Sequence, residues 1–307
     1  MRKLLAGRAV CQVSTTVLYS YPKRVIRLRF AAGLAAAALL VVAAGCGQGD
    51  SKLIVGATTS LDDSGILQEL IDEFKERSGY DVTPVVAGSG QILELGRRGE
   101  VDVTFTHSPP DESSFLAEGF GIDPRRVMEN RFLIVGPDDD PALVAGASDS
   151  IQAFQRIAAA EAPFISRGDE SGTNRREMAI WDDAGIDPSG EGWYQESAVG
   201  QGENLLVASN KQAYLLVDSA TYTALKDVVE LTSFVVDDVV NRYTVALVNP
   251  NLHDEVNAEV ATAFIDFLAS EPAEAIINSF GREEFGVQLF YLPGALDEPP
   301  AFPFPLQ

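Results

Sequence analysis

Histidine and cysteine are scarce in this chain of 307 residues, which contains two of each. Metal sites and catalytic triads that need several His or Cys side chains therefore have almost nothing to draw on. Basic residues are also few, since 23 Lys and Arg stand against 45 Asp and Glu and the formal net charge is −22. A nucleic-acid-binding face needs a surplus of basic side chains, so we expect no nucleic-acid partner.

Nucleotide and hydrolase signatures are missing as well. The sequence contains no G-x-x-x-x-G-K-[ST] loop and no G-x-G-x-x-G after a strand, which argues against the common phosphate and dinucleotide sites. It has no G-x-S-x-G elbow either. The apolar run at residues 30–44 is shorter than the roughly 20 residues that a membrane-spanning helix requires.

That apolar run belongs to a segment with the organisation of an export signal. Residues 1–46 contain seven Lys or Arg and no acid, so the remainder carries a formal charge of −29. Basic residues, an apolar stretch and the small pair Ala44-Gly45 precede Cys46, an order typical of an export signal. Ala44-Gly45-Cys46 resembles a bacterial lipobox, although Leu is usual where Ala43 stands.

We therefore expect a lipoprotein signal peptide at 1–45, a lipid anchor on Cys46, and a tether at 46–51. The alternative is that Cys46 is a buried or incidental cysteine. Cys11 would leave with the signal, so we expect no disulfide in the mature chain. Such a protein would be exported and held on the extracytoplasmic face of the cell membrane.

The rest of the chain reads as alternating strands and helices. Hydrophobic residues make up 46% of the sequence, enough for sizeable cores. Alternation of this kind predicts an open α/β sheet. Apolar patterns and breakers predict strands at 52–56, 81–87, 101–106, 131–135, 163–166, 213–217 and 242–248. They predict helices at 62–79, 91–98, 112–119, 151–158, 174–184, 204–209 and 256–268.

A composition break divides this pattern into two lobes. The acidic turn at 138–141 follows the fourth predicted strand, and a late apolar strand lies near 242–248. We expect lobe 1 to comprise 52–135 plus 245–295, lobe 2 to comprise 136–244, and 296–307 to form a proline-rich tail. Two crossovers between the lobes would form a hinge with a ligand cleft between the lobes.

Three turns rich in Gly, Ser and Thr connect a predicted strand to a predicted helix. Helix N-termini present unpaired N–H groups with partial positive charge, and open α/β sheets bind ligands at the carboxyl ends of their strands. These turns therefore suit an anion such as an oxyanion. The alternative is simple helix capping, and Asn174 with Glu177 has the spacing of a capping box. The turns are residues 57–60, 88–90 and 167–173, and the third contains Arg167, a fixed cationic donor.

His107 and Ser171 raise a different hypothesis, a secreted serine hydrolase. His107 ends the third predicted strand, and Ser171 precedes a predicted helix. The sequence offers no identifiable third member for such a site, and a lone His is more often a structural hydrogen-bonding group. We therefore expect a protein that is not an enzyme.

At this point the motifs resemble a known family, the tungstate-specific solute-binding proteins of bacterial ABC importers. The matching segments lie between residues 53 and 250 and include ATTSLDDSGIL at 57–67, GSGQ at 88–91, SRGDESGT at 166–173 and GQG at 200–202. The resemblance implies a type II periplasmic-binding-protein-like fold, an α/β protein whose two lobes close over one tetrahedral oxyanion. It also implies a ligand-binding set of nine residues, Thr58, Thr59, Ser60, Ser89, Gly90, Arg167, Ser171, Gly172 and Thr173.

The sequence departs from the family pattern at a few positions. Ala57 replaces a Thr, Arg131 stands where Asp is common, Asn174 where His is common, and Ser219 where Arg is common. The resemblance implies capture of tungstate as an oxyanion, with no cofactor, and delivery to an ABC permease in the membrane by a monomer. Molybdate, sulfate and phosphate receptors remain alternatives. Phosphate keeps a proton at neutral pH and would need an acceptor, which could be Asp62, Asp63, Asp169 or Glu170.

Overall fold

The computed structural model describes residues 51–296, and of Val236 and Asp238 the backbone alone. The predicted signal peptide, Cys46 and the tail beyond residue 296 lie outside the described residues. In order, the strands and helices are β1 (Lys52–Thr58), α1 (Thr59–Asp63), α2 (Ile66–Ser78), β2 (Asp81–Ala87), α3 (Ser89–Arg97), β3 (Val103–Thr106), α4 (Pro109–Ala117), β4 (Gly121–Gly136), a 3₁₀ turn (Val144–Gly146), α5 (Ser150–Ala159), β5 (Phe164–Ser166), α6 (Gly172–Asp183), β6 (Tyr194–Glu196), α7 (Gln201–Lys211), β7 (Leu215–Asp218), α8 (Ser219–Leu225), β8 (Thr232–Val248), α9 (Ala258–Leu268) and α10 (Glu271–Ser279).

The main sheet has six strands in the order β2-β1-β3-β8-β4-β7. Strand β1 is parallel to β2 and β3, whereas β8 is antiparallel to both β3 and β4, and β7 is antiparallel to β4. Strands β5 and β6 form a small parallel sheet of their own. Helices follow β1, β2, β3, β5 and β7 directly, so the alternating α/β pattern predicted from the sequence is present.

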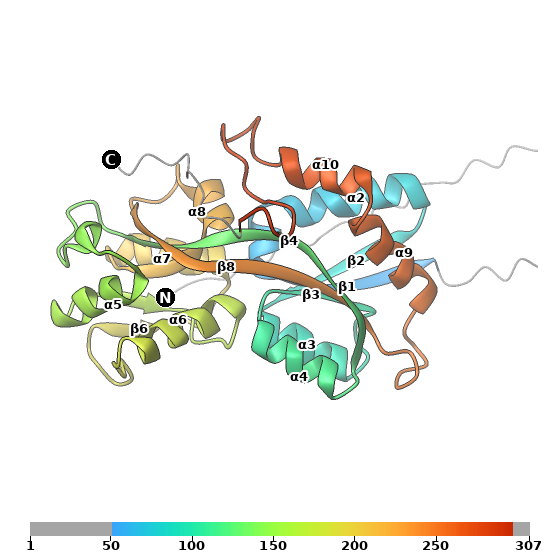
Figure 1. Cartoon of the computed structure of the whole chain (residues 1–307), viewed down its shortest axis with the longest axis horizontal. Coiled ribbons are helices and arrows are strands. Elements are labelled where there is room, and N and C mark those ends of the chain that lie inside the picture. The colour runs from blue at the N-terminus through green and yellow to red at the C-terminus, as the bar shows by residue number, and fades with distance from the viewer. Residues whose placement is uncertain (1–50, 297–307) are drawn as a thin grey trace, which may run out of the picture. The chain divides into compact units, whose positions relative to one another are not determined.

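The pair β4 and β8 connects the two ends of this sheet. Figure 1 shows the two strands as a long ribbon, with β1, β2 and β3 near one end and α5, α6 and α7 near the other. The sequence prediction of short strands at 131–135 and 242–248 was wrong in length, because β4 has 16 residues and β8 has 17. Register shifts along the pair bend it locally, as β-bulges do.

The predicted helix at 62–79 is interrupted. Gly65 has φ of 88°, a left-handed conformation that glycine adopts without steric cost, and it separates α1 from α2. The apolar stripe predicted on this helix is confirmed, since its five residues are buried. They are Ile66, Leu67, Leu70, Ile71 and Phe74.

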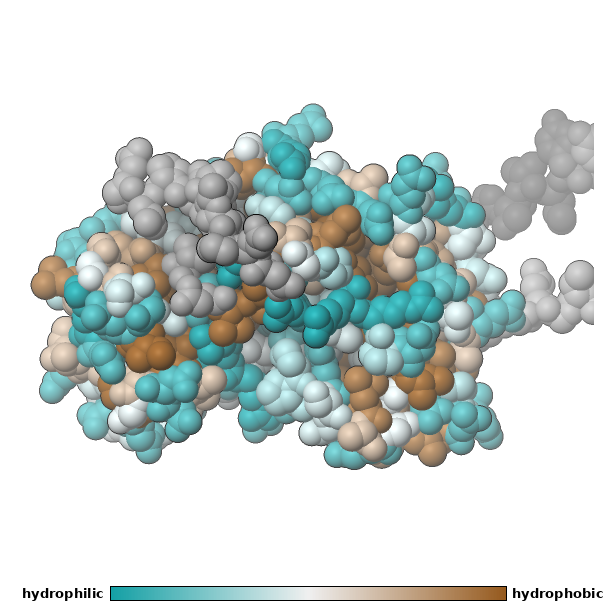
Figure 2. All heavy atoms as spheres, viewed as in Figure 1, coloured by the Kyte–Doolittle hydropathy of each residue, from teal (hydrophilic) through white to brown (hydrophobic). Residues whose placement is uncertain are grey.

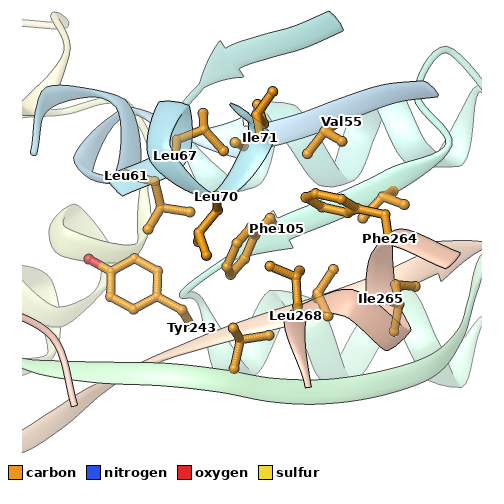
Figure 3. Packing of buried hydrophobic residues seen from close by; sticks show 14 of the residues in the cluster. Val55, Leu61, Leu67, Leu70, Ile71, Phe105, Tyr243, Phe264, Ile265 and Leu268 are labelled. Atoms are coloured by element: carbon orange, nitrogen blue, oxygen red, sulfur yellow. The ribbon is translucent and has the colours of Figure 1, made fainter. Parts of the chain in front are cut away.

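Buried hydrophobic residues of the described chain gather in separate clusters. The largest packs β1, β2 and β3 against α2, α9 and α10, with Phe105 and Phe264 fully buried. Figure 3 shows this core, with Tyr243 at one side and its hydroxyl turned away from the aliphatic side chains. Further clusters form around Phe154 and Trp181, and around Leu205 and Val217. Along β4, Met128 belongs to the largest cluster and Phe132 to the cluster around Phe154 and Trp181, so the change from one core to the next lies close to the proposed hinge.

The visible surface is mainly polar. Figure 2 shows hydrophilic residues over much of one face, with hydrophobic patches scattered between them. Within residues 51–296, no helix combines the length and the apolar character needed to cross a bilayer.

Candidate functional site

The first predicted turn lies where β1 runs into α1. Thr58 is the N-cap residue and is fully buried, and its Oγ1 has no hydrogen-bond partner within the described structure. Thr59 Oγ1 accepts a hydrogen bond from the backbone N–H of Gln201 at 3.3 Å. Ser60 Oγ lies 3.1 Å from the hydroxyl of Tyr243. This turn is therefore linked to both α7 and β8.

The second turn begins α3 and touches the third. Ser89 is buried, and its Oγ accepts a hydrogen bond from the backbone N–H of His107 at 3.3 Å. A Cβ placed on Gly88 would lie 3.4 Å from the Cβ of Ser171, and one placed on Gly90 would lie 3.1 Å from the backbone oxygen of Glu170. Glycine at both positions thus allows the two turns to meet.

The third turn, at residues 166–173, centres on the buried guanidinium of Arg167. Its Nη2 donates to Asp169 Oδ2 at 2.5 Å and its Nη1 donates to Gln201 Oε1 at 3.1 Å, whereas Nε has no partner within the described structure. The Asp169 carboxylate also accepts from the backbone N–H of Ser171 at 3.1 Å. The ion pair with Asp169 shows that Arg167 contributes to the structure of its own loop.

Helix α6 begins at Gly172 and brings Thr173 to the same region. The N-cap is Ser171, whose Oγ accepts from the backbone N–H of Asn174 at 3.3 Å. The predicted capping role of Asn174 was therefore wrong, because its side chain binds back to Glu170 N and Ser166 Oγ. Thr173 is buried, and its Oγ1 has no hydrogen-bond partner among the described residues.

A buried polar network from β3 and β8 joins the turns. Gly172 packs so closely on His107 that a Cβ there would lie 2.4 Å from the His107 backbone oxygen. His107 Nδ1 lies 2.8 Å from Asn241 Oδ1, and Asn241 Nδ2 donates to the Tyr243 hydroxyl at 3.1 Å. Since Tyr243 contacts Ser60, hydrogen bonds and packing connect all three turns.

This network fixes the protonation of His107. Burial lowers the pKa of His107 to about 4, so the imidazole is neutral at pH 7. The Asn241 amide nitrogen donates to Asn130 Oδ1 and to the Tyr243 hydroxyl, so the amide oxygen faces Nδ1 and Nδ1 carries the proton. Nε2 is then an acceptor, and no partner of it lies within the described structure.

This arrangement does not suit the hydrolase hypothesis. Ser171 Oγ caps α6, and His107 is held by an amide oxygen rather than by a carboxylate. His107 Nε2 makes no hydrogen bond with Ser171. In residues 51–296 no group of three or more His, Cys, Asp and Glu side chains is placed to hold a metal ion.

The hydroxyl groups of these turns share one property that matters for binding. Thr59, Ser89 and Ser171 each accept a backbone N–H, which leaves their own hydrogens free to donate. Thr58 Oγ1, Thr173 Oγ1 and Arg167 Nε are buried without a partner in the part of the chain that the structure describes. Buried donors are normally satisfied, so a set of free ones from separate turns points to a ligand that accepts hydrogen bonds.

Two carboxylates lie beside these donors. Asp169 is paired with Arg167, and Asp63 Oδ2 accepts from the backbone N–H of Gly202 at 2.8 Å. Burial raises the pKa of Asp63 to about 6, opposed in part by the bond from Gly202. A groove of about 1060 Å³ opens next to Asp169, between α3, α4 and the 168–170 loop.

Residues that depart from the family pattern have structural partners here. Arg131 Nη2 donates to the backbone oxygen of Leu296 at 2.6 Å. Ser219 Oγ accepts from the backbone N–H of Arg131 at 3.4 Å, and Ala57 is a buried member of the main core. These contacts place Arg131 and Ser219 in the framework that carries the turns.

Sequence reasoning missed several residues of this region, chiefly Gln201, Asn241 and Tyr243. Gln201 lies in the GQG segment of the resemblance but was not among the predicted ligand residues, although its side chain is fully buried against Arg167. Asn241 and Tyr243 lie in the strand β8, whose first half was not predicted. The sequence feature that could have indicated them is the pair of polar side chains, Asn241 and Tyr243, at the start of an apolar segment.

The sheet topology and the arrangement of the helices are those of a known class, the type II periplasmic-binding-protein-like α/β proteins. Residues 42–272 match the family model of the PBP superfamily domain. The tungstate-binding protein TupA of Peptoclostridium acidaminophilum is 38% identical over 247 residues, which cover 79% of this chain and 86% of that protein. TupA of Campylobacter jejuni is 31% identical over 227 residues, covering 72% and 84% respectively.

A solved structure agrees with these matches. The structure described as the tungstate ABC transporter from Geobacter sulfurreducens is 38% identical, with a TM-score of 0.69, over 75% of this chain and 98% of that one. The chain belongs to the PBP superfamily and, within it, to the family of the TupA solute-binding proteins. The fold class expected from the sequence is thereby confirmed.

Proposed function

We propose that this protein is the substrate-binding component of an ABC importer and that its substrate is tungstate. The similarity to proteins named for tungstate binding supports the substrate. The observation that carries the proposal is the group of buried donors that lack a partner among the described residues, Thr58 Oγ1, Arg167 Nε and Thr173 Oγ1. A tetrahedral dianion has four oxygen atoms that would accept such hydrogen bonds.

The proposed ligand-binding set is the one expected from the sequence: Thr58, Thr59, Ser60, Ser89, Gly90, Arg167, Ser171, Gly172 and Thr173. Three of these residues, Thr59, Ser89 and Ser171, also accept a structural hydrogen bond that leaves their own hydroxyl hydrogen free to donate. Arg167 supplies full positive charge, and the N-termini of α3 and α6 supply partial charge. The groove beside Asp169 is the proposed route of entry.

Lobe closure is part of the proposal. We assign residues 52–135 plus 245–295 to lobe 1 and 136–244 to lobe 2, with β4 and β8 as the two crossovers. The contacts of Gly90 with Glu170 and of Gly172 with His107 would join the lobes around the anion. A permease would then recognise the closed form.

Isothermal titration calorimetry of the purified protein against tungstate, molybdate, sulfate and phosphate tests the substrate. We expect tungstate to bind at a stoichiometry of one, and sulfate and phosphate to bind far more weakly. Failure of tungstate to bind under conditions where the protein is folded would contradict the proposal.

Phosphate is the alternative that the structure itself suggests. At neutral pH it keeps a proton and needs an acceptor. Asp169 is an acceptor, and so is His107 Nε2, which has no partner among residues 51–296. Asp169 is already paired with Arg167, which makes it a poor acceptor for a further proton. Tighter binding of phosphate than of tungstate in the same titration would reverse the assignment.

The remaining proposals concern the ends of the chain and its assembly. We propose that Cys46 is the lipidated N-terminus of a monomer tethered to the extracytoplasmic face of the membrane. The support is the order of basic, apolar and small residues before Cys46. Metabolic labelling with a fatty-acid analogue should mark the wild type and fail to mark Cys46→Ala.

A further inference from the structure

The N-terminus of α7 receives its hydrogen-bond partners from a different helix. The N-cap residue, Gly200, has no side chain with which to cap the free N–H groups. Instead, Gln201 N donates to Thr59 Oγ1 at 3.3 Å and Gly202 N donates to Asp63 Oδ2 at 2.8 Å. Thr59 and Asp63 are four residues apart in α1, so they lie on the same face of that helix.

Close packing accompanies these bonds. A Cβ on Gly202 would lie 3.1 Å from the carboxyl carbon of Asp63, so a glycine lets α1 approach the backbone of α7. The two helices are anchored in different cores. Leu61 of α1 belongs to the cluster of β1, β2 and β3, whereas Leu205 of α7 belongs to the cluster of β7. The capping contact therefore joins two separately packed parts of the chain.

The first side chain of α7 reaches the buried cation of the site. Gln201 Oε1 accepts from Arg167 Nη1 at 3.1 Å, and Gln201 Nε2 donates to the backbone oxygen of Leu216 at 3.4 Å. Gln201 is fully buried, so its amide has a fixed position. With Nη1 held by Gln201 and Nη2 held by Asp169, Nε is the guanidinium nitrogen of Arg167 that has no partner in the described structure. Because Gln201 is the first residue of α7 and binds Nη1, the position of the first turn of α7 determines the direction in which Nε donates.

We infer that Gln201 is a positioning residue through which docking of α1 onto α7 aligns Arg167 for the bound oxyanion. This inference rests on the proposed function. When the two parts of the chain close, Thr59 and Asp63 fix the first turn of α7, and Gln201 transmits that position to Arg167. Closure of the two parts of the chain and alignment of the Arg167 guanidinium therefore occur together.

Substitutions at Asp63 test the capping contact, because the capping contact and simple electrostatics predict opposite changes in tungstate affinity. Removing a negative charge near an anion site should strengthen anion binding. The capping contact predicts that Asp63→Ala weakens tungstate binding roughly tenfold, mainly through faster dissociation, because Gly202 N loses its acceptor. Asp63→Asn keeps an acceptor oxygen and should restore most of the affinity. Asp62→Ala is the matched control, since Asp62 is the exposed neighbour and its removal changes the charge equally.

Gln201→Met tests the link to Arg167, because Met keeps the volume but lacks the amide. Tungstate dissociation constants and melting temperatures would be measured for Gln201→Met, Arg167→Ala and the double variant. We expect Gln201→Met to weaken binding roughly tenfold alone and to add little when Arg167 is already replaced.

Two results would overturn the inference. One is unchanged affinity in Asp63→Ala, or tighter binding equal to that of Asp62→Ala. The other is a Gln201→Met effect of full size in the Arg167→Ala background. Should Gln201→Met fail to fold, the Asp63 series decides alone. If the wild type itself does not bind tungstate, the proposed function fails, and that result is distinct from both.

Discussion

Replacing Arg167 by alanine is the most direct test of the site. The guanidinium is buried, its Nη1 and Nη2 donate to Gln201 and Asp169, and its Nε has no hydrogen-bond partner within the described structure. A hydrogen bond from a charged group contributes ~1.5–3 kcal/mol. The variant would also leave the Asp169 carboxylate without its cation next to an incoming dianion. We expect Arg167→Ala to weaken tungstate binding roughly 10–1000-fold, at ~1.4 kcal/mol per tenfold.

Stability must be separated from binding, because Arg167 also holds its own loop. The side chains of Arg167 and Asp169 are 1% and 12% exposed, and breaking a buried ion pair costs about 3 kcal/mol or more. For a domain of this size that corresponds to a decrease of very roughly 6–12 °C in melting temperature. Calorimetric titration well below the lowered melting temperature measures affinity on folded protein.

Asp169→Ala is the matched control, since it breaks the same ion pair from the other side. If Arg167 binds the oxyanion, the two variants should differ, because Asp169→Ala keeps the cation and should retain far more of the tungstate affinity than Arg167→Ala. If Arg167 only supports the loop, both variants should lower the melting temperature and neither should change the affinity. That second pattern would refute the assignment of Arg167 as a ligand.

Further predictions follow from other contacts. Thr173→Ala should lower affinity by about one neutral hydrogen bond, ~1 kcal/mol, and Thr173→Ser should restore it; titration calorimetry measures both. Gly172→Ala places a Cβ 2.4 Å from the His107 backbone oxygen, so we expect roughly 5–150-fold weaker binding from a strain of ~1–3 kcal/mol. Burial raises the pKa of Glu177 from the ordinary 4.5 to about 7, so the folded state holds this proton more tightly than the unfolded state does. The stabilisation that this proton gives is fully present below pH 4.5 and is lost as the pH rises through 7. Denaturant unfolding of Glu177→Gln should therefore show a higher free energy of unfolding at pH 8 than the wild type and a flatter dependence on pH.

The helices and strands that were predicted well are those whose pattern is local. Strand β2 was predicted at its observed bounds, and the stripe of α2 was predicted residue by residue. The break at Gly65 was missed because an apolar period of 3.6 continues across it, although a glycine within the pattern was a signal. The pattern of burial was thus easier to predict than the exact ends of each helix.

Strands β4 and β8 were underestimated for a physical reason. Their central residues include polar and charged side chains such as Glu129, Arg131 and Asp237, which are buried and paired. Such residues do not give the alternating or continuous apolar pattern of an ordinary strand. The pairing that keeps them extended joins segments that are far apart in the sequence, and a single sequence does not show it.

The turns of the site were predictable because their chemistry is local, whereas their partners were not. A Gly, Ser or Thr residue between a strand and a helix is visible in the sequence. The bonds that bring the turns together are long-range, with separations of 142 residues for Thr59 and Gln201, 134 for His107 and Asn241, and 183 for Ser60 and Tyr243. The sequence thus predicted the three turns but not the buried amides and the tyrosine that hold them in position.

A chain with a net charge of −22 can still present a site for a dianion, because exposed carboxylates and buried hydrogen-bond donors act over different distances. Exposed carboxylates are screened by salt beyond about 8 Å, whereas buried donors act within hydrogen-bond distance in a medium of low polarity. The carboxylates next to the site have local partners, Asp169 on Arg167 and Asp63 on the N-terminus of α7. Their negative charge is used to hold the donors in place. In the proposed site, the sign of the ligand's charge is therefore set by buried donors that lack a partner in the described structure, and not by the composition of the surface.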